Sequence, residues 1–246
     1  MESVRANRDH WNRISAAYQA EHDRQIGARP RIWGAFSIGD DQLDALGSVR
    51  GRIVLEIGCG AGQWSRALAA EAARVVGLDV SEAQLAAARR AISGTRCSLV
   101  HGAAQRLPFA DASFDVALSD HGGLSWAPPQ RTVAEAARVL RPGGRLVFCH
   151  LSPLAQCCYD ERDDTVTDRL RAPYFTLGSI AEAGGASTYQ LTYGGWIRVL
   201  RDAGLTVLDL IEPRPEPGQA SGYYQFRPAG WATRWPCEAL WVASKP

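Results

Sequence analysis

The segment Val54–Trp64 reads VLEIGCGAGQW and constrains the fold more than any other part of the chain. A short apolar run ends at an acid and opens into three glycines at alternate positions, Gly58, Gly60 and Gly62, before a helix-forming stretch. Glycines are needed where a strand turns sharply into a helix and a ligand lies against the backbone, because a Cβ there occupies the ligand's place. The segment therefore predicts a strand, a ligand-binding turn and a helix.

The same order of strand, turn and helix repeats through residues 51–152. Ser81 with Gln84 three residues later is a capping-box pattern that starts one of the helices. Strands are predicted at Arg52–Ile57, Val75–Leu78, Cys97–Val100, Phe114–Ser119 and Arg145–Cys149. Helices are predicted at Gln63–Ala73, Ser81–Ile92 and Arg131–Leu140. This alternation predicts a parallel sheet with helices on both faces.

Two acids narrow the ligand that the glycine loop binds. Glu56 lies at the end of the first strand and suits a ligand with an ammonium group, whereas it repels a pyrophosphate. Asp79 ends the second strand, where an acid accepts the hydroxyls of an adenosine ribose. A dinucleotide loop needs a glycine where Gln63 stands, and a GK[ST] phosphate loop is excluded because the only lysine is Lys245. The pattern favours an adenosine derivative without phosphates, of which S-adenosylmethionine is the common one.

At this point the chain resembles the class I S-adenosylmethionine-dependent methyltransferases, in particular the methyltransferase type 11 or UbiE-like group. Four motifs carry the resemblance, in the order and spacing of that group: VLEIGCGAGQW, VVGLDVSEAQLAAAR, GAAQRLPFADASFDVALS and AARVLRPGGRLVF. The resemblance implies a Rossmann-like, seven-stranded, mostly parallel α/β sheet whose last strand is antiparallel. It also implies an N-terminal helical cap (1–50), a cofactor-binding core (51–152), a substrate-side insertion (153–192) and a C-terminal part that completes the sheet (193–246).

The resemblance assigns cofactor contacts residue by residue. The residues expected to bind S-adenosylmethionine are Tyr18, Glu56, Gly58, Cys59, Gly60, Gln63, Trp64, Asp79, Val80, Ala103, Ala104, Gln105 and Ser119. One position departs from the family pattern, because Ala103 stands where an acid usually bonds the adenine amino group. This departure leaves open weaker adenine selectivity, compensation by Gln105, or a protein that has kept the fold and lost catalysis.

The acceptor side is predicted from residues at the ends of the fourth and fifth strands. Asp120, His121 and His150 are the candidate catalytic residues, with His121 as base or orienting group, because an imidazole titrates near neutrality. Asp120 and His121 are not expected to pair directly, since neighbours in an extended chain point to opposite sides. Aromatic residues outside the core predict a planar or hydrophobic acceptor. The substrate-binding candidates, besides His121, are Trp11, Trp33, Tyr159, Tyr174, Tyr189 and Tyr193.

Composition bounds the partners and the compartment. The 246 residues carry 27 basic and 26 acidic side chains, which disfavours nucleic acid as a partner. The first thirty residues form neither a signal peptide nor a membrane anchor, so a cytoplasmic protein with no membrane partner is expected, as a monomer or homodimer. The six cysteines lack zinc spacing, so no metal is expected. The function predicted is methyl transfer to an O, N or C atom of a small metabolite, in secondary metabolism; the alternatives are an RNA or protein methyltransferase and a non-catalytic S-adenosylmethionine-binding protein.

Overall fold

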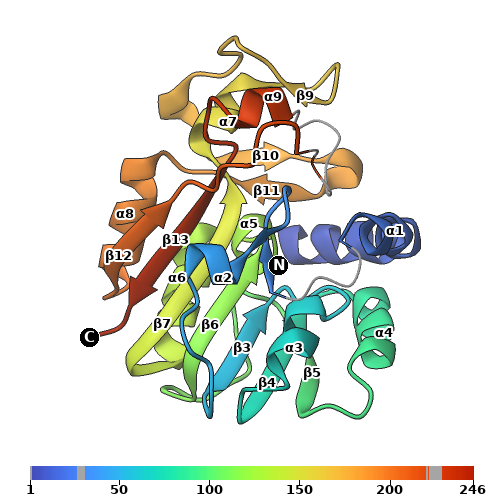
Figure 1. Ribbon diagram of the computed structural model, residues 1–246, viewed down its shortest axis with the longest axis vertical. Coiled ribbons are helices and arrows are strands. Elements are labelled where there is room, and N and C mark those ends of the chain that lie inside the picture. Colours follow the sequence, from blue (N-terminus) through green and yellow to red (C-terminus); the bar gives the residue numbers. More distant parts are fainter. Residues whose placement is uncertain (1, 27–30, 220, 222–228) are drawn as a thin grey trace.

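The computed structural model describes residues 2–26, 31–219, 221 and 229–246. Its central element is a seven-stranded sheet with the order β12-β13-β7-β6-β3-β4-β5 (Figure 1). The strands are β3 (Ile53–Ile57), β4 (Arg74–Asp79), β5 (Cys97–His101), β6 (Phe114–Asp120), β7 (Leu140–Leu151), β12 (Thr206–Ile211) and β13 (Glu238–Ser244). β3 to β7 pair in parallel, whereas β13 is antiparallel to both β7 and β12. The predicted Rossmann-like sheet with an antiparallel last strand is confirmed.

Helices cover both faces of the sheet because successive strand residues point to opposite faces and both sets are apolar. On one face, Leu55 and Phe148 pack with α6 (Pro129–Val139) and α8 (Tyr193–Asp202). On the other, Val54 and Val147 pack with α3 (Gln63–Leu68) and residues 45–49.

The helix α3 is shorter than the helix predicted at Gln63–Ala73. It ends at Leu68 because the chain turns back there to enter β4.

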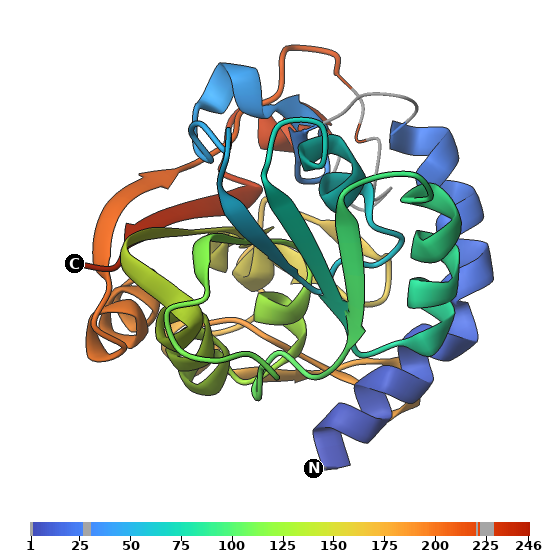
Figure 2. The ribbon, with the colours of Figure 1, turned by 90° about the horizontal axis from the view of Figure 1, so that it is seen from below.

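The helix α4 (Glu82–Ala91) begins where the sequence predicts. The Ser81 hydroxyl oxygen accepts the Gln84 N–H at 3.1 Å, so the capping contact is formed. The long N-terminal helix α1 (Glu2–Ile26) runs alongside α4, as Figure 2 shows. Asn12 fixes this pairing, because its Oδ1 accepts the Ser81 hydroxyl at 2.7 Å and the Ala83 N–H at 3.1 Å.

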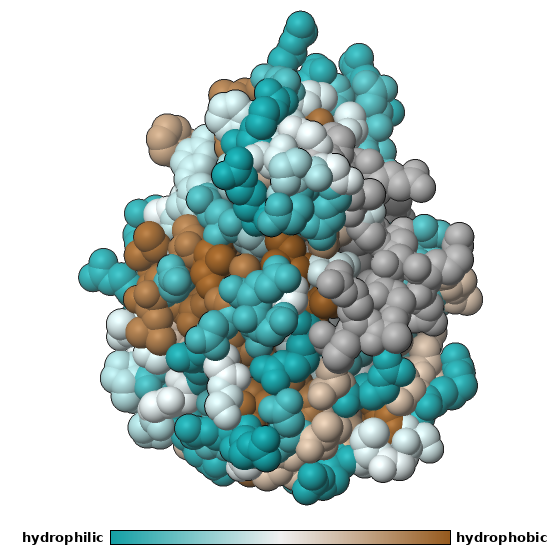
Figure 3. Space-filling view, in the orientation of Figure 1, coloured by the Kyte–Doolittle hydropathy of each residue, from teal (hydrophilic) through white to brown (hydrophobic). Residues whose placement is uncertain are grey.

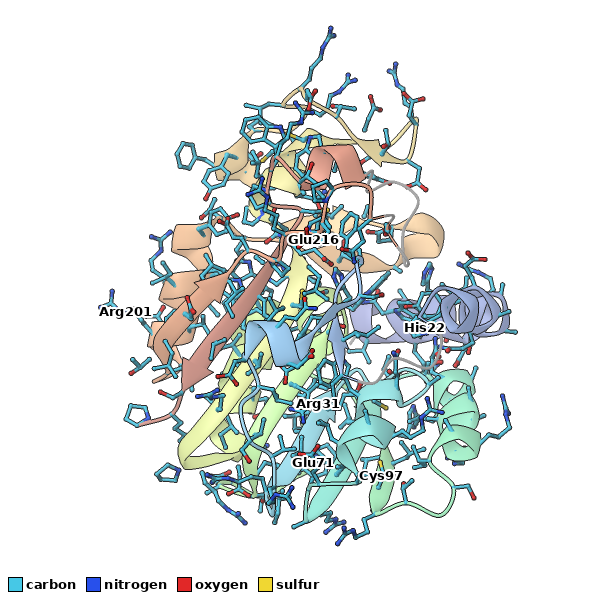
Figure 4. The ribbon with its side chains drawn as sticks, viewed as in Figure 1. His22, Arg31, Glu71, Cys97, Arg201 and Glu216 are labelled. Atoms are coloured by element: carbon cyan, nitrogen blue, oxygen red, sulfur yellow. The ribbon has the colours of Figure 1, made fainter. Side chains whose placement is uncertain are left out.

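The segment after α1 crosses the carboxyl end of the sheet. It contains β1 (Ile32–Trp33), β2 (Ile38–Gly39) and the short α2 (Asp40–Leu43). Arg31 fastens it, with its guanidinium 2.9 Å from Asp40 and 3.3 Å from Glu71, which is labelled with Arg31 in Figure 4. The turn between β1 and β2 lies at the end of β6, where the Gly34 N–H donates to Asp120.

Residues 153–192 lie beyond the carboxyl ends of the strands, at the top of Figure 1. This predicted insertion is built of short regular elements. They are α7 (Pro153–Cys158), β8 (Tyr159–Asp160), β9 (Thr165–Val166), η1 (Tyr174–Thr176), β10 (Ser179–Ala181), η2 (Ala183–Gly185) and β11 (Ser187–Tyr189). The remaining helices are α5 (Gly123–Trp126) and α9 (Ala229–Ala232). Each is too short for a period in the apolar pattern to reveal it.

The surface is not evenly polar. Figure 3 shows apolar side chains gathered on the side of this face where β12 lies in Figure 1. β12 is an edge strand, and its Leu208 is 52% exposed.

No helix within the described residues has the length and apolarity required to cross a bilayer.

Candidate functional site

The glycine loop between β3 and α3 is packed against a second glycine pair. Gly58 has φ +80°, and a Cβ on it would lie 2.2 Å from the backbone N of Gly123. Gly60 has φ +51°, but a Cβ there would meet only the Gln84 side chain, at 3.9 Å. The first glycine therefore permits contact between two loops, and the second leaves open space for a ligand.

Asp79 ties the loop to the end of β4. Its carboxylate accepts the Gly60 N–H at 2.8 Å and the Ser81 N–H at 2.9 Å. Burial raises the pKa of this carboxyl, and the two backbone donors oppose that rise. The acid is held in one position at the cavity wall by these two donors.

Glu56 lines the cavity and also contacts the start of α3. Its carboxyl accepts both the backbone N–H of Ser65, at 2.8 Å, and the Ser65 hydroxyl, at 2.5 Å. Burial raises the pKa of Glu56 to about 8. Without a cation beside it the group is therefore protonated at neutral pH, and its first partner is the start of α3.

These elements surround a cavity of about 450 Å³ at the end of β3, which lies between β4 and β6 in the sheet. That volume is in the range of small-molecule sites, and the place is the switch point of the sheet. The helix α1 covers the cavity with Trp11 and Tyr18, whose rings meet edge to face at 5.0 Å. The predicted residues that line it are Trp11, Tyr18, Glu56, Gly58, Cys59, Gly60, Gln63, Trp64, Asp79, Val80, Ala103, Ala104, Gln105, Asp120 and His121.

Three predicted residues lie in the protein interior instead. The Ser119 hydroxyl is buried and donates to the carbonyl oxygen of Ile57 at 2.8 Å. Trp33 is fully buried, with its ring 4.4 Å from that of Trp64 and its Nε1 donating to Asp40 at 2.9 Å. The His150 ring stacks on that of Phe148 and lies 4.7 Å from the tilted ring of Trp196, and burial lowers the pKa of His150 to about 3. None of these three is among the residues that line the cavity, and Ser119 links β6 to β3.

The four tyrosines predicted to bind substrate do not line this cavity. Tyr174 and Tyr193 border a separate shallow hollow beside α7, with Leu154 and Leu170. The Tyr159 hydroxyl lies 2.5 Å from Asp164, and Tyr189 pairs with Ser179 in the β10–β11 hairpin. The insertion packs against α1 and α5 through η2 and β11, and its tyrosines are not among the residues that line the cavity.

His121 is the predicted residue with the most unusual surroundings. Its φ is +49°, a left-handed conformation that is rare outside glycine and occurs at functional sites. Its backbone N–H donates to the Cys149 carbonyl oxygen at 2.9 Å, and its Nε2 lies 2.5 Å from Oε1 of Glu238. Asp120 accepts the Gly34 N–H at 3.2 Å, and burial raises its pKa to about 6. The partner of His121 in this contact is Glu238, in agreement with the expectation that Asp120 is not its direct partner.

Glu238 was not among the predicted site residues. It is 1% exposed at the first position of β13, and it also accepts the Ala35 N–H at 2.8 Å. The signal in the sequence is one buried acid opening the apolar run EALWVA. The ligand atoms of Asp120, His121 and Cys149 lie within 4.8 Å of one another, the one such group in the described parts of the chain. Asp120 and His121 already have the partners above, and the expectation that no metal binds stays untested.

Comparisons with known proteins agree with this geometry. Residues 55–148 match a family model described as a methyltransferase domain. These matches, together with the fold, support a class I S-adenosylmethionine-dependent methyltransferase. A demethylmenaquinone methyltransferase of Clavibacter sepedonicus is 38% identical over 57% of this chain and 62% of its own length. The ubiquinone/menaquinone biosynthesis C-methyltransferase UbiE of Paracoccus denitrificans is 34% identical over 61% and 62%.

Solved structures show the same fold. An S-adenosylmethionine-dependent methyltransferase from Mesorhizobium loti has 25% identity and a TM-score of 0.69, over 83% of this chain and 96% of its own. The [4+2]-cyclase SpnF has 19% identity and a TM-score of 0.63, over 99% and 96%. This chain spans about three fifths of the two quinone-pathway relatives, and the similarity to both is confined to that part.

S-adenosylmethionine is the cofactor of this family, and the cavity fits it. Gly60 leaves the space that a Cβ would reduce, and Asp79 lies at the wall beside it. The Gln19 Oε1 is buried there without a hydrogen-bond partner, although its amide nitrogen donates to Gln84 at 2.6 Å. A buried acceptor of this kind needs a donor, which the amino groups of the cofactor supply.

Proposed function

We propose that the protein transfers a methyl group from S-adenosylmethionine to an O, N or C atom of a small apolar or aromatic metabolite. The observation that carries this proposal is the single cavity that joins the Gly58–Gly60 loop and Asp79 to His121. A methyltransferase must hold donor and acceptor in line about 3 to 3.5 Å apart, so both ligands have to share one enclosed space. The cavity meets this requirement.

The chain supplies binding and orientation at the cofactor end. Asp79 would accept the ribose hydroxyls, the Gly58–Gly60 backbone would hold the methionine part, and Val80, Ala103 and Ala104 would border the adenine, since all of them line the cavity. The bound cofactor supplies an electrophilic methyl group on a sulfonium. Closure by Trp11 and Tyr18 of α1 excludes water from the reacting groups.

The acceptor end is apolar on one side and polar on the other. Val4, Trp11, Ile32 and Trp126 supply apolar surface, and His121 supplies the titratable group. The two curated relatives cited above have names that refer to quinone biosynthesis, which is consistent with a planar acceptor. Planar rings stack on aromatic walls, and the Trp11 and Trp126 rings lie 4.9 Å apart here.

Calorimetric titration with S-adenosylhomocysteine, the demethylated cofactor, tests the cofactor half of the proposal. The wild-type protein is expected to bind one equivalent, and Asp79→Asn is expected to bind at least about tenfold more weakly, since about 1.4 kcal/mol of hydrogen bonding to the ribose is lost. Asp202→Asn, an exposed acid on α8, is the matched control and keeps wild-type affinity. No heat with the wild-type protein contradicts the proposal.

A screen with isotopically labelled cofactor tests the transfer. Label is expected in the small-molecule fraction when planar aromatic acceptors are supplied. Label in added RNA or protein instead supports a macromolecular acceptor, and tight cofactor binding without turnover of any acceptor supports a non-catalytic protein.

A further inference from the structure

A continuous set of contacts joins the turn after β1 to His121. The turn presents two successive backbone N–H groups to two carboxyls: Gly34 donates to Asp120 at 3.2 Å, and Ala35 donates to Glu238 at 2.8 Å. Glu238 in turn contacts Nε2 of His121. A Cβ on Gly34 would lie 2.3 Å from Glu238 Oε2, so this glycine permits the carboxylate to approach the turn.

This arrangement selects one state of the imidazole. A carboxylate beside Nε2 favours the hydrogen on Nε2, which leaves Nδ1 as the basic nitrogen of the neutral ring. The side chains of His121 and Glu238 are only 11% and 1% exposed, so the pair is shielded from water. The backbone of His121 is also fixed, since it has a left-handed conformation and its N–H donates to the Cys149 carbonyl oxygen. A histidine that lines a cavity and is oriented by an acid is the arrangement that a general base requires.

The charges around His121 disfavour a free anion at this end of the cavity. Glu238 approaches from β13, Asp120 from β6, and Cys149 and His150 from β7. Burial raises the pKa of Asp120 to about 6 and that of Glu56 to about 8, which means that their surroundings resist further negative charge. A pre-formed phenolate is therefore poorly stabilised here, and its proton has to leave during the transfer.

We propose that the acceptor atom is the oxygen of a phenolic or enolic hydroxyl, with His121 as its general base and Glu238 as the residue that positions and balances His121. This rests on the proposed methyl transfer. The O–H bond breaks toward Nδ1 of His121 while the oxygen forms its bond to the methyl carbon. The carbon–sulfur bond breaks and its electron pair stays on sulfur, which becomes a neutral thioether, and the imidazolium is left beside the Glu238 carboxylate.

An amine acceptor has less need of a general base than a hydroxyl acceptor has. Methylation of a neutral amine produces an ammonium group, which neighbouring carboxylates stabilise before any proton is lost. A hydroxyl oxygen becomes a strong nucleophile only as its proton leaves, so general-base help acts on it in the transition state. The oriented base thus favours oxygen over nitrogen.

Two probes of nearly the same shape separate these chemistries: 7-hydroxycoumarin and 7-aminocoumarin. The wild-type protein with S-adenosylmethionine is expected to methylate the hydroxyl probe at least about tenfold faster than the amino probe, because an aromatic amine is a weak nucleophile that the base does not assist. His121→Ala and Glu238→Gln are expected to lower kcat for the hydroxyl probe by about 10²-fold or more, with KM changed much less. Asp160→Asn is the matched control, because Asp160 is also a buried acid but pairs with Arg171 on the insertion.

A second readout does not depend on turnover. ¹⁵N spectra of the histidine rings, with S-adenosylhomocysteine bound, are expected to show His121 with hydrogen on Nε2 and none on Nδ1 in the wild-type protein. In Glu238→Ala the ring is expected to exchange between both tautomers, and in Glu238→Asp the single tautomer is expected to persist. A merely structural role for Glu238 predicts no tautomer change in a variant that still folds.

The outcomes separate this inference from the proposed function. Equal turnover of the two probes, unchanged kcat in His121→Ala, or no turnover of 7-hydroxycoumarin while cofactor binds overturns the hydroxyl-specific base and leaves cofactor binding intact. Failure to bind S-adenosylhomocysteine overturns both.

Discussion

Three glycines with positive φ provide a way to separate backbone strain, loop packing and ligand space. Gly51, Gly58 and Gly60 have φ of +71°, +80° and +51°, but a Cβ on each meets different surroundings. Gly51 has no heavy atom within 4 Å, Gly58 meets the backbone of Gly123 at 2.2 Å, and Gly60 meets only a flexible side chain at 3.9 Å. An alanine at each of the three positions therefore has similar backbone strain, but its Cβ meets different neighbours.

The expected changes in the free energy of unfolding follow from those surroundings. A left-handed alanine costs about 1–2 kcal/mol, which is the whole effect for Gly51→Ala and for Gly60→Ala. In Gly58→Ala the Cβ lies more than 1 Å inside ordinary contact with a backbone atom, so the two loops must separate, at an additional cost of about 1–3 kcal/mol. Gly58→Ala is thus expected to lose about 2–5 kcal/mol.

Urea denaturation gives the stabilities, and calorimetry with S-adenosylhomocysteine gives the affinities. Gly60→Ala is expected to fold nearly as well as Gly51→Ala but to bind the ligand more weakly, because its Cβ enters the ligand space. If Gly58→Ala is no less stable than Gly51→Ala, the packing of the two loops is refuted. If Gly60→Ala binds as tightly as Gly51→Ala, the placing of the ligand against Gly60 is refuted.

Three further changes have definite expected outcomes. The raised pKa of Glu56 means that the folded state keeps a proton which the unfolded state releases, so stability falls as pH rises from about 4.5 to 8, by up to about 1.4 kcal/mol per pH unit; Glu56→Gln should flatten this slope in urea denaturation between pH 6 and 8, and an unchanged slope contradicts the assignment. Lys245→Met should lose about 1–2 kcal/mol by the same assay, because Nζ donates to the carbonyl oxygens of Ala137 and Leu140 at 2.8 and 2.7 Å at the end of α6; no loss means that these contacts do not form in solution. Trp33→Phe should lower stability by about 1–3 kcal/mol without raising the KM for acceptor, and a selective rise in KM supports the predicted substrate-binding role instead.

Local chemistry accounts for what the sequence predicted well. The glycine loop, Asp79 and the Ser81 cap are each specified by neighbours within a few residues, because a sharp turn, a ribose acceptor and a free backbone donor are short-range requirements. The five core strands are likewise visible as apolar runs between turn residues.

Long-range packing accounts for what it missed. Glu238 lies 117 residues from His121 and reaches it only because β13 inserts beside β7, and nothing in the local sequence specifies that register. Trp33 is drawn into the core because Asp40 satisfies its N–H there. The insertion packs against α1 and α5 through η2 and β11, and Tyr159, Tyr174 and Tyr189 are not among the residues that line the cavity.

The most direct test of the account is a crystal structure of the protein with S-adenosylhomocysteine. The account predicts the ribose hydroxyls on the Asp79 carboxylate, the backbone of Gly58–Gly60 along the amino-acid part, and the sulfur directed toward the end of the cavity that His121 lines. A ligand bound outside this cavity, or one whose sulfur points away from His121, contradicts it.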